Sequence, residues 1–368
     1  MRRAASRIVL AALMFAGGAI AIHAETRLAQ AGSEAQTPAP HRGEISGAGS
    51  ALAYPMLANW AEAYEKISGY GLNYKPIGSG GGIKKIAERS VTFGASDRPL
   101  SARERQAAGD VLQWPVVLDG IVPVVNLDGV KSGDLTLDGA TLAKIFLGQI
   151  KMWDDPAIEQ LNPNVNLPST AITIIHRADG SITTFIFTDY LAKVNLEWKS
   201  KIGSGMSVEW PAGIGSKGSP GVPNEVLNTA NSISYVFAVD IRSYPALASV
   251  KMVNEDGFVV SADAATIQAA AENADWEHGD GFDIVLTAQK GRNSWPMVVA
   301  NFVLMPKRVP DEAAAKEALK YFAWAYDNGD KIAYGLYYVP IPEKVKKLIR
   351  AQWIEITGPG GKPVYQEP

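Results

Sequence analysis

The feature that most constrains the fold of this chain is a repeated order of short β-type runs followed by helical patterns. A β-type run over 72–77 precedes a helical pattern, a second over 114–126 precedes one at 141–146, and a third over 171–176 precedes one near 182. This repetition is typical of α/β domains with mainly parallel sheets. In such sheets ligands bind beyond the carboxyl ends of the strands, where the next helix begins.

The third of these helices has an unusually polar start. The segment 176–190, HRADGSITTFIFTDY, combines an arginine, a carboxylate and several hydroxyls. Apolar residues then recur at helical spacing, at Phe187, Tyr190, Leu191 and Val194. This spacing predicts a helix from Ser181 or Ile182, whose free N–H groups would form an anion site beside Arg177. The same residue types are also ordinary N-caps, and Arg177 could be a surface charge, so this segment alone favours neither interpretation.

Two further segments have the same arrangement. Ser79 lies in a glycine-rich turn before a short helix, whose expected apolar face is Ile83, Ile86 and Ala87. Near the front of the folded region, the sequence GAGS at 47–50 precedes a helix that ends by Gly69. Its expected apolar stripe is Leu57, Trp60, Ala61, Tyr64 and Ile67. Each glycine turn is a weak signal, since 47–49 lacks the third glycine of a dinucleotide-binding fingerprint. Their combination with Arg177 and Asp97 indicates one anion site.

Composition excludes several classes of function. With 368 residues, 47% hydrophobic and 20% charged, the chain is long enough for two globular domains. It has no cysteine. Because its net charge is −3, nucleic acid and anionic membranes are poor partners. The four histidines are scattered, and neither a nucleophile elbow nor a phosphate-binding GxxxxGK loop is present. Carboxylates such as Asp97, Asp179 and Asp189 are more often ion-paired than catalytic. No catalytic residue, metal site or cofactor is therefore predicted.

The N-terminus has the pattern of a secretory signal. Arg2, Arg3 and Arg7 form a basic region before an apolar stretch, so residues 1–24 are interpreted as a signal peptide. A transmembrane anchor is the alternative, but the apolar run is short for a span. Residues 25–43, rich in Ala, Gln and Pro, are interpreted as a disordered spacer. An exported chain without cysteine is most simply a soluble protein of a bacterial periplasm.

Two long apolar runs suggest that the chain crosses twice between domains. Residues 116–125 are almost wholly apolar, and a second run covers 298–304. Two crossings would form a hinge. After Pro310 and Asp311, a well-capped helix is expected to present Leu319, Phe322, Ala323 and Tyr326 on one face.

Several segments together resemble the periplasmic substrate-binding proteins of bacterial phosphate-specific ABC transporters. The resemblance rests on 47–60, 77–100 and 177–195, and continues through 209–218, 233–236 and 276–296. It implies an α/β, two-lobe type II periplasmic binding fold that closes on one phosphate by hinge bending. The implied lobes are 44–117 with 297–368, and 118–296.

The resemblance also implies site residues and partners. Side-chain contacts to phosphate are assigned to Ser79, Asp97, Arg177, Ser181 and Thr183. Asp179 would orient the arginine, and backbone N–H donors would come from Ala51, Leu52 and Ile182. The implied partners are inorganic phosphate and an inner-membrane ABC permease complex. The chain is expected to act as a monomer in the periplasm, without membrane insertion.

This sequence departs from the family pattern at three positions. Ala51 and Leu52 stand where the family commonly has Thr-Phe, and Ile182 stands where it has glycine. These departures leave open a receptor for a related oxyanion, such as arsenate or a phosphonate. A secreted phosphatase and a surface protein that reuses the fold are two further interpretations. Asp97 argues for phosphate, because an acceptor in the site matches the P–OH donor of phosphate and sulfate has no such donor.

Overall fold

The computed structural model describes residues 41–278 and 281–366. The predicted signal peptide and all but the last residues of the predicted spacer lie outside the described residues. The first strand, β1, begins at Gly43. No helix in the described part of the chain is long and apolar enough to cross a bilayer.

One mixed sheet organises the described residues, in the strand order β2-β1-β3-β12-β4-β8-β6-β7, and β9 pairs with β4. Its strands are β1 (Gly43–Gly49), β2 (Tyr70–Lys75), β3 (Phe93–Ser96), β4 (Val111–Asn126), β6 (Thr173–Arg177), β7 (Ile214–Ser216), β8 (Ser232–Phe237), β9 (Ala248–Ser249) and β12 (Val298–Pro306). A second sheet has the order β11-β10-β5, from β5 (Thr136–Leu137), β10 (Lys251–Val253) and β11 (Val259–Val260).

Helices connect and cover these strands. They are α1 (Tyr54–Ser68), α2 (Ser79–Ala87), α3 (Ala102–Ala107), α4 (Gly139–Phe146), α5 (Pro156–Leu161), α6 (Ile182–Val194), α7 (Leu196–Lys201), α8 (Gly221–Asn228), α9 (Ala264–Asn273), α10 (Glu312–Asn328), α11 (Asp330–Gly335) and α12 (Glu343–Gln352). Short 3₁₀ helices cover Val239–Ser243 and Trp353–Glu355. The expected strand and helix order is confirmed, including the start of α6 at Ile182.

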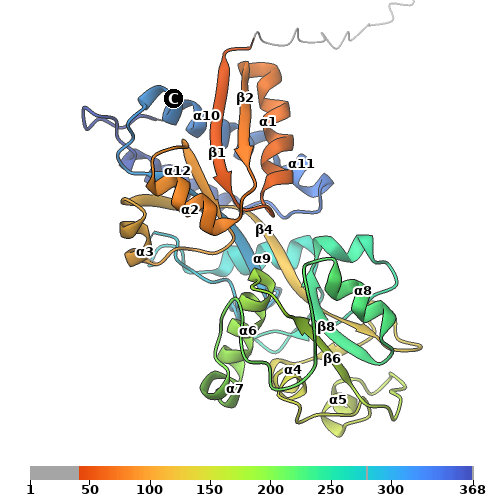
Figure 1. Ribbon diagram of the computed structural model, residues 1–368. Helices are drawn as coiled ribbons and strands as arrows, with labels where there is room; N and C mark the ends of the chain where they lie inside the picture. Colours follow the sequence, from red (N-terminus) through yellow and green to blue (C-terminus); the bar gives the residue numbers. More distant parts are fainter. Residues whose placement is uncertain (1–40, 279–280, 367–368) are drawn as a thin grey trace, which may run out of the picture. The chain divides into compact units, whose positions relative to one another are not determined.

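Strand β4 links the two parallel parts of the sheet. Its 16 residues are buried except for Asn126. The first part of β4 pairs with β12 and the last part pairs with β8, both antiparallel. Figure 1 shows β4 passing through the middle of the ribbon, with β1, β2 and α2 on one side and β6, β8 and α8 on the other.

The expectation of mainly parallel sheets is wrong for this central region. Strands β1, β2 and β3 are parallel, and so are β6, β7 and β8. Between them, β12 runs antiparallel to both β3 and β4. The reason is that β12 returns the chain after the second half is complete, and a returning strand beside an outgoing one must run antiparallel.

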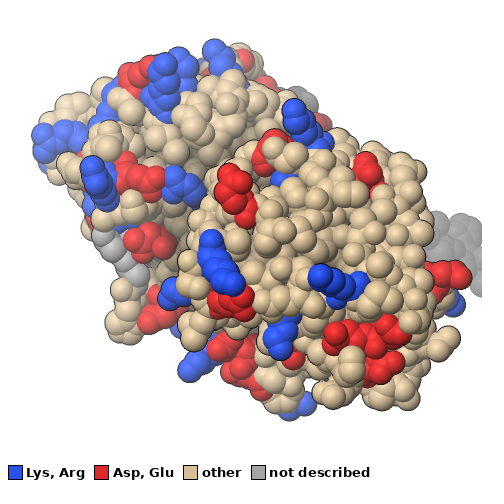
Figure 2. All heavy atoms as spheres, turned by 60° about the horizontal axis from the view of Figure 1, so that its bottom comes forward, with Lys and Arg blue, Asp and Glu red and all other residues tan. Residues whose placement is uncertain are grey.

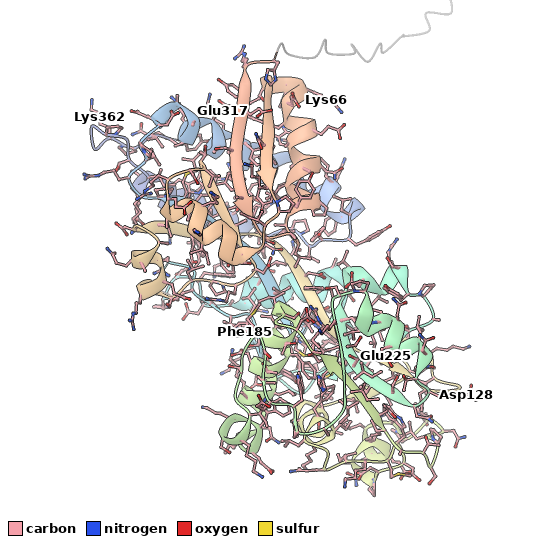
Figure 3. The ribbon with its side chains drawn as sticks, in the orientation of Figure 1. Lys66, Asp128, Phe185, Glu225, Glu317 and Lys362 are labelled. Carbon is pink, nitrogen blue, oxygen red and sulfur yellow. The ribbon has the colours of Figure 1, made fainter. Side chains whose placement is uncertain are left out.

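Two of the expected apolar faces differ from the structure. In α1 the buried stripe begins at Met56, while Ile67 in the last turn is 50% exposed. Helix α1 packs against α10, where the Tyr64 hydroxyl donates to buried Glu317 at 2.6 Å; Figure 3 labels Glu317. In α2 the buried positions are Gly82 and Ile86, and Ala87 is exposed.

Glycine explains how α2 lies so close to the strands. A Cβ at Gly82 would stand 2.6 Å from the Cα of Gly49 and 2.8 Å from the carbonyl oxygen of Ala95. Gly49 has φ +141, and its own added Cβ would stand 2.1 Å from the same carbonyl oxygen. Side chains at these positions would push the helix start away from the strand ends. The glycines therefore place the start of α2 directly at the carboxyl ends of β1 and β3.

Candidate anion-binding site

One group of polar residues lies at the carboxyl ends of β1 and β3. Ser50 follows β1, Asp97 follows β3, and Ser79 is the first residue of α2. Ser79 Oγ donates to Asp97 Oδ2 at 2.9 Å and accepts from the Asp97 N–H at 3.0 Å. Ser50 Oγ donates to Asp97 Oδ1, and Asn301 Nδ2 on β12 donates to the same oxygen at 2.7 Å. These four residues form the Asp97 group.

Two effects shift the pKa of the Asp97 carboxylate in opposite directions. Burial raises the pKa of Asp97 above its usual range, while hydrogen bonds from Ser50, Ser79 and Asn301 lower it. Donors that stabilise the charged form therefore offset part of the burial cost. The geometry also fixes the Ser50 hydroxyl: its hydrogen points at Asp97, and its oxygen accepts from the Ala53 N–H at 2.9 Å. In this arrangement the one hydrogen of the Ser50 hydroxyl is bound to Asp97.

A second group lies at the carboxyl end of β6. Arg177, the last residue of the strand and 9% exposed, donates from Nε to Asp179 Oδ1 at 2.8 Å and from Nη2 to Oδ2 at 2.6 Å. Its Nη1 has only a long contact, 3.5 Å, to Ser219 Oγ. The Gly218 N–H donates to Asp179 at 3.0 Å. Because a guanidinium has five N–H donors, this pairing orients Arg177 and leaves its Nη1 edge for an anion.

The start of α6 belongs to this second group. Ser181 is the N-cap, and its Oγ accepts from the Thr183 N–H at 3.2 Å. The two hydroxyls, Ser181 Oγ and Thr183 Oγ1, lie 2.6 Å apart and share one hydrogen, so the other hydrogen remains available to a ligand. Ile182 is the first helical residue and does not have positive φ. The isoleucine therefore fits its backbone conformation, although the resemblance implies glycine at this position.

Ala51 and Leu52 lie in the turn between β1 and α1. Two backbone carbonyl groups of this turn accept hydrogen bonds from tyrosines. The Tyr74 hydroxyl donates to the Ser50 carbonyl at 2.8 Å, and the Tyr338 hydroxyl donates to the Leu52 carbonyl at 2.7 Å. Within residues 41–278 and 281–366, no hydrogen-bond acceptor is found for the N–H groups of Ala51 and Leu52. Both groups are consequently free to donate to a ligand.

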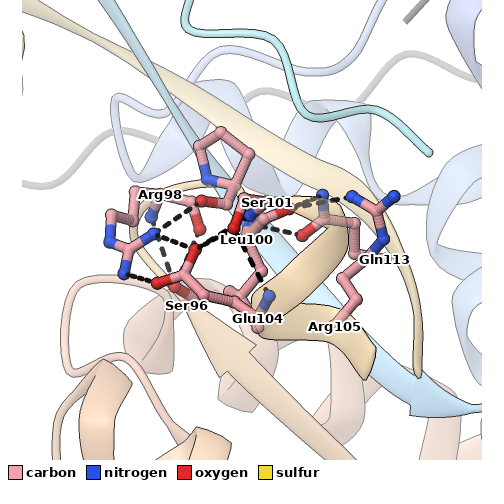
Figure 4. Close-up of polar contacts among 8 residues, drawn as sticks. Ser96, Arg98, Leu100, Ser101, Glu104, Arg105 and Gln113 are labelled. Carbon is pink, nitrogen blue, oxygen red and sulfur yellow. Dashed lines mark hydrogen bonds and ion pairs between the residues drawn. The ribbon is translucent and has the colours of Figure 1, made fainter. Parts of the chain in front are cut away.

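Arg98, next to Asp97 in sequence, is engaged elsewhere. Its guanidinium donates to Glu104 at 3.1 and 2.5 Å and to the Pro99 carbonyl at 2.9 Å. Figure 4 shows this ion pair beside Ser101 and Gln113. The pairing lowers the pKa of Glu104 to about 2. Arg98 therefore forms an ion pair with Glu104 of α3 rather than with Asp97.

Sequence reasoning missed three polar residues near these groups. Asn301 contacts Asp97 directly. Asp240, after β8, lines a cavity of about 10 Å³ with Arg177, Thr183 and Ser219, room for about one water molecule. Asp119 in β4 is 1% exposed; burial raises its pKa well above the usual range, and the charge of nearby Asp240 acts in the same direction. Only the tertiary fold brings these residues to the site, because none lies within a recognisable motif.

The face of the molecule drawn in Figure 2 carries charges of both signs, with basic and acidic side chains interspersed. Attraction of an anion therefore depends on Arg177 and the free N–H groups rather than on the charge of the whole protein. The described residues contain no group of three or more His, Cys, Asp or Glu side chains that could hold a metal ion.

Two polar groups at the carboxyl ends of two parallel strand sets, connected by β4 and β12, define a receptor of the periplasmic binding protein type. A family model described as "PBP superfamily domain" matches residues 34–353. The phosphate-binding protein PstS of Xylella fastidiosa (strain Temecula1) is 45% identical over 314 residues, 84% of this chain and 85% of that protein. The PstS protein of Pasteurella multocida is 45% identical over 324 residues, 88% of this chain and 93% of that protein. The chain therefore belongs to the PBP superfamily and, within it, to the family of these PstS proteins.

Solved structures share the same fold. An ABC-type phosphate transport receptor from Vibrio cholerae superimposes with a TM-score of 0.55 at 15% identity, over 81% of this chain and all (100%) of the receptor. A high-affinity periplasmic phosphate-binding protein, PfluDING, bound with phosphate, gives a TM-score of 0.58 at 20% identity, over 84% of this chain and 94% of PfluDING. The expected α/β, two-lobe type II periplasmic binding fold is confirmed.

Proposed function

We propose that this protein captures inorganic phosphate in the periplasm and delivers it to an ABC importer. The observation that carries the proposal is that the protein offers both kinds of polar group that such a ligand needs. Arg177 has a free edge of N–H donors, and Asp97 is a buried carboxylate that can accept a hydrogen bond. A tetrahedral anion that keeps a proton needs both a donor fork and an acceptor. The names of the 45% identical PstS relatives support the same ligand.

In this proposal the two groups bind one phosphate from opposite lobes. Ser79 and Asp97, with the N–H groups of Ala51 and Leu52, belong to the lobe of 44–117 and 297–368. Arg177, oriented by Asp179, belongs to the lobe of 118–296 and acts with the α6 start. The α6 contacts come from Ser181, Ile182 and Thr183. Bending at β4 and β12 closes the lobes on the ligand, and the closed form docks on the permease.

The protein is proposed to act as a monomeric receptor rather than as an enzyme. Asp97 and Asp179, one carboxylate from each of the two groups, both accept hydrogen bonds that stabilise their charge. Asp179 has its pKa lowered to about 2, chiefly by the hydrogen bond from Arg177. A carboxylate in this state orients the arginine and is a poor proton carrier at neutral pH. Hydrolysis of a chromogenic phosphate ester would contradict the assignment.

Titration calorimetry tests which anion the protein binds. Protein from about residue 25 is unfolded, refolded to remove carried ligand, and titrated with phosphate, arsenate, methylphosphonate and sulfate. We expect tight binding of phosphate and no detectable heat with sulfate. A preference for arsenate, methylphosphonate or sulfate, or no binding of any of the four anions, would overturn the proposal.

Asp240 is expected to make phosphate binding weaken as the pH rises. Burial raises the pKa of Asp240 to about 6, and Arg177 acts in the opposite direction. Above pH 6 the ionised carboxylate competes with phosphate for Arg177; below pH 6 it is neutral. Asp240→Asn should bind phosphate on the order of fivefold more tightly than wild type at pH 8 and equally well at pH 5, since one such charge contributes about 1 kcal/mol.

The measured quantity is the ratio of the two dissociation constants at each pH. Because the ligand's own titration affects both proteins equally, it cancels in this ratio. A ratio that stays constant from pH 5 to pH 8 would show that Asp240 does not titrate next to the ligand.

A further inference from the structure

The carboxylate of Asp97 is held by side chains that come from three separate elements. Ser50 follows β1, Ser79 begins α2, and Asn301 lies on β12. Ser50 is 0% exposed and Asn301 is 1% exposed. Neither of these two buried residues is among the proposed ligand contacts. Their polar atoms therefore require another explanation, since burying polar groups costs free energy.

Counting donors and lone pairs shows what the arrangement leaves open. Oδ1 of Asp97 accepts from Ser50 Oγ and from Asn301 Nδ2, which fills its two acceptor positions. Oδ2 accepts only from Ser79 Oγ. Oδ2 therefore keeps one free acceptor position. The Ser50 hydrogen has no alternative direction, because Ser50 Oγ also accepts from the Ala53 N–H and lies 3.4 Å from Asn301 Nδ2.

Asn301 is placed by an irregularity in its strand. The register of β12 against β4 shifts between Asn301 and Phe302, and such bulges re-aim a side chain. The amide oxygen of Asn301 is buried and has no hydrogen-bond partner among the described residues. An unpaired buried acceptor costs about 1–3 kcal/mol. An asparagine with this cost, at a bulge and aimed at Asp97, points to a role in binding rather than in stability.

We propose that Asn301 and Ser50 are positioning residues that set the anion selectivity of the site, by fixing Asp97 with one oxygen saturated and one acceptor position facing the ligand. This inference rests on the proposed phosphate site and deepens it. A ligand that offers one P–OH donor satisfies the open position. Sulfate offers only acceptors, so one of its oxygens would face the open acceptor position of Asp97 with no hydrogen between them. Ser50 and Asn301 prevent Asp97 from rotating out of that position.

Loss of either donor should make the selectivity depend more strongly on pH. Hydrogen bonds from Ser50 and Asn301 keep the pKa of Asp97 lower than burial alone would place it. Without one of them the carboxyl takes a proton at a higher pH, and a protonated Asp97 donates to sulfate instead of repelling it. The neighbouring groups that also act on this region are Tyr74 and Tyr338, whose own pKa values burial raises above the range of the experiment.

The test compares sulfate and phosphate dissociation constants by calorimetry between pH 5 and pH 8.5. The variants are Asn301→Leu, which keeps the side-chain size and removes the amide, Ser50→Ala, and Ser50→Thr, which retains the hydroxyl. Asn162→Leu is the matched control. Asn162 is also a buried asparagine, but its amide forms hydrogen bonds with the backbone of Thr136 and Ile158 and none with the Asp97 group.

We expect Asn301→Leu and Ser50→Ala to reduce the sulfate-to-phosphate ratio of dissociation constants by about tenfold or more, and to move the pH at which discrimination is lost upward. Ser50→Thr and Asn162→Leu should keep the wild-type ratio. If Asn301→Leu does not fold, Ser50→Ala decides. A folded variant with weaker binding of both anions and an unchanged ratio at every pH would overturn the inference. Wild-type protein that does not prefer phosphate would overturn the proposed function and this inference together.

Discussion

Replacing Arg177 with methionine is expected to weaken phosphate binding by about 10²- to 10⁴-fold. The guanidinium would supply two charge-assisted hydrogen bonds to the anion, each contributing about 1.5–3 kcal/mol. The change also leaves Asp179 without the partner that lowers its pKa, so an uncompensated negative charge would stand beside the ligand. Titration calorimetry of the folded variant at pH 7 measures the effect.

Arg98→Met is the matched control for this substitution. Arg98 is the arginine next to Asp97, but its guanidinium is bound by Glu104. Its removal should change phosphate affinity by less than about threefold, because the pair is partly exposed to solvent and does not include Asp97. Comparable losses in both variants would mean that the effect of Arg177 is general rather than local.

Asp97→Asn is expected to lower discrimination against sulfate by about 10²-fold. The amide oxygen should stay where Oδ1 accepts from Ser50 and Asn301. The amide nitrogen then occupies the position of Oδ2, so the open acceptor becomes a donor. Phosphate loses an acceptor for its P–OH group, and sulfate gains a donor for one of its oxygens. Calorimetry with both anions at pH 7 measures the change.

Asp189→Asn serves as the control. Asp189 lies farther along α6, where it accepts from Thr287 and pairs with Lys193 at 3.1 Å, and it belongs to neither group of the site. Its substitution should leave the sulfate-to-phosphate ratio unchanged. Wild-type selectivity in Asp97→Asn would show that another group rejects sulfate.

Local patterns were sufficient for much of the fold. The helical spacing after Ser181 predicted α6, and the apolar run at 116–125 predicted a buried central strand, which is β4. Both signals reside in neighbouring residues, where periodicity and capping act. The expected faces of α1 and α2 were less accurate, since the exposure of Ile67 and Ala87 depends on which neighbouring elements cover each helix turn.

The sequence by itself determined the element order, the polar helix starts and the residues that resemble a phosphate site. Only the tertiary structure decided how those residues are held. Asp97 and Asn301 are 204 positions apart, and Asp119 and Asp240 were not expected at all near the site. The physical reason is that sheet register and the antiparallel return of β12 set these contacts, and no local periodicity encodes a pairing between such distant strands.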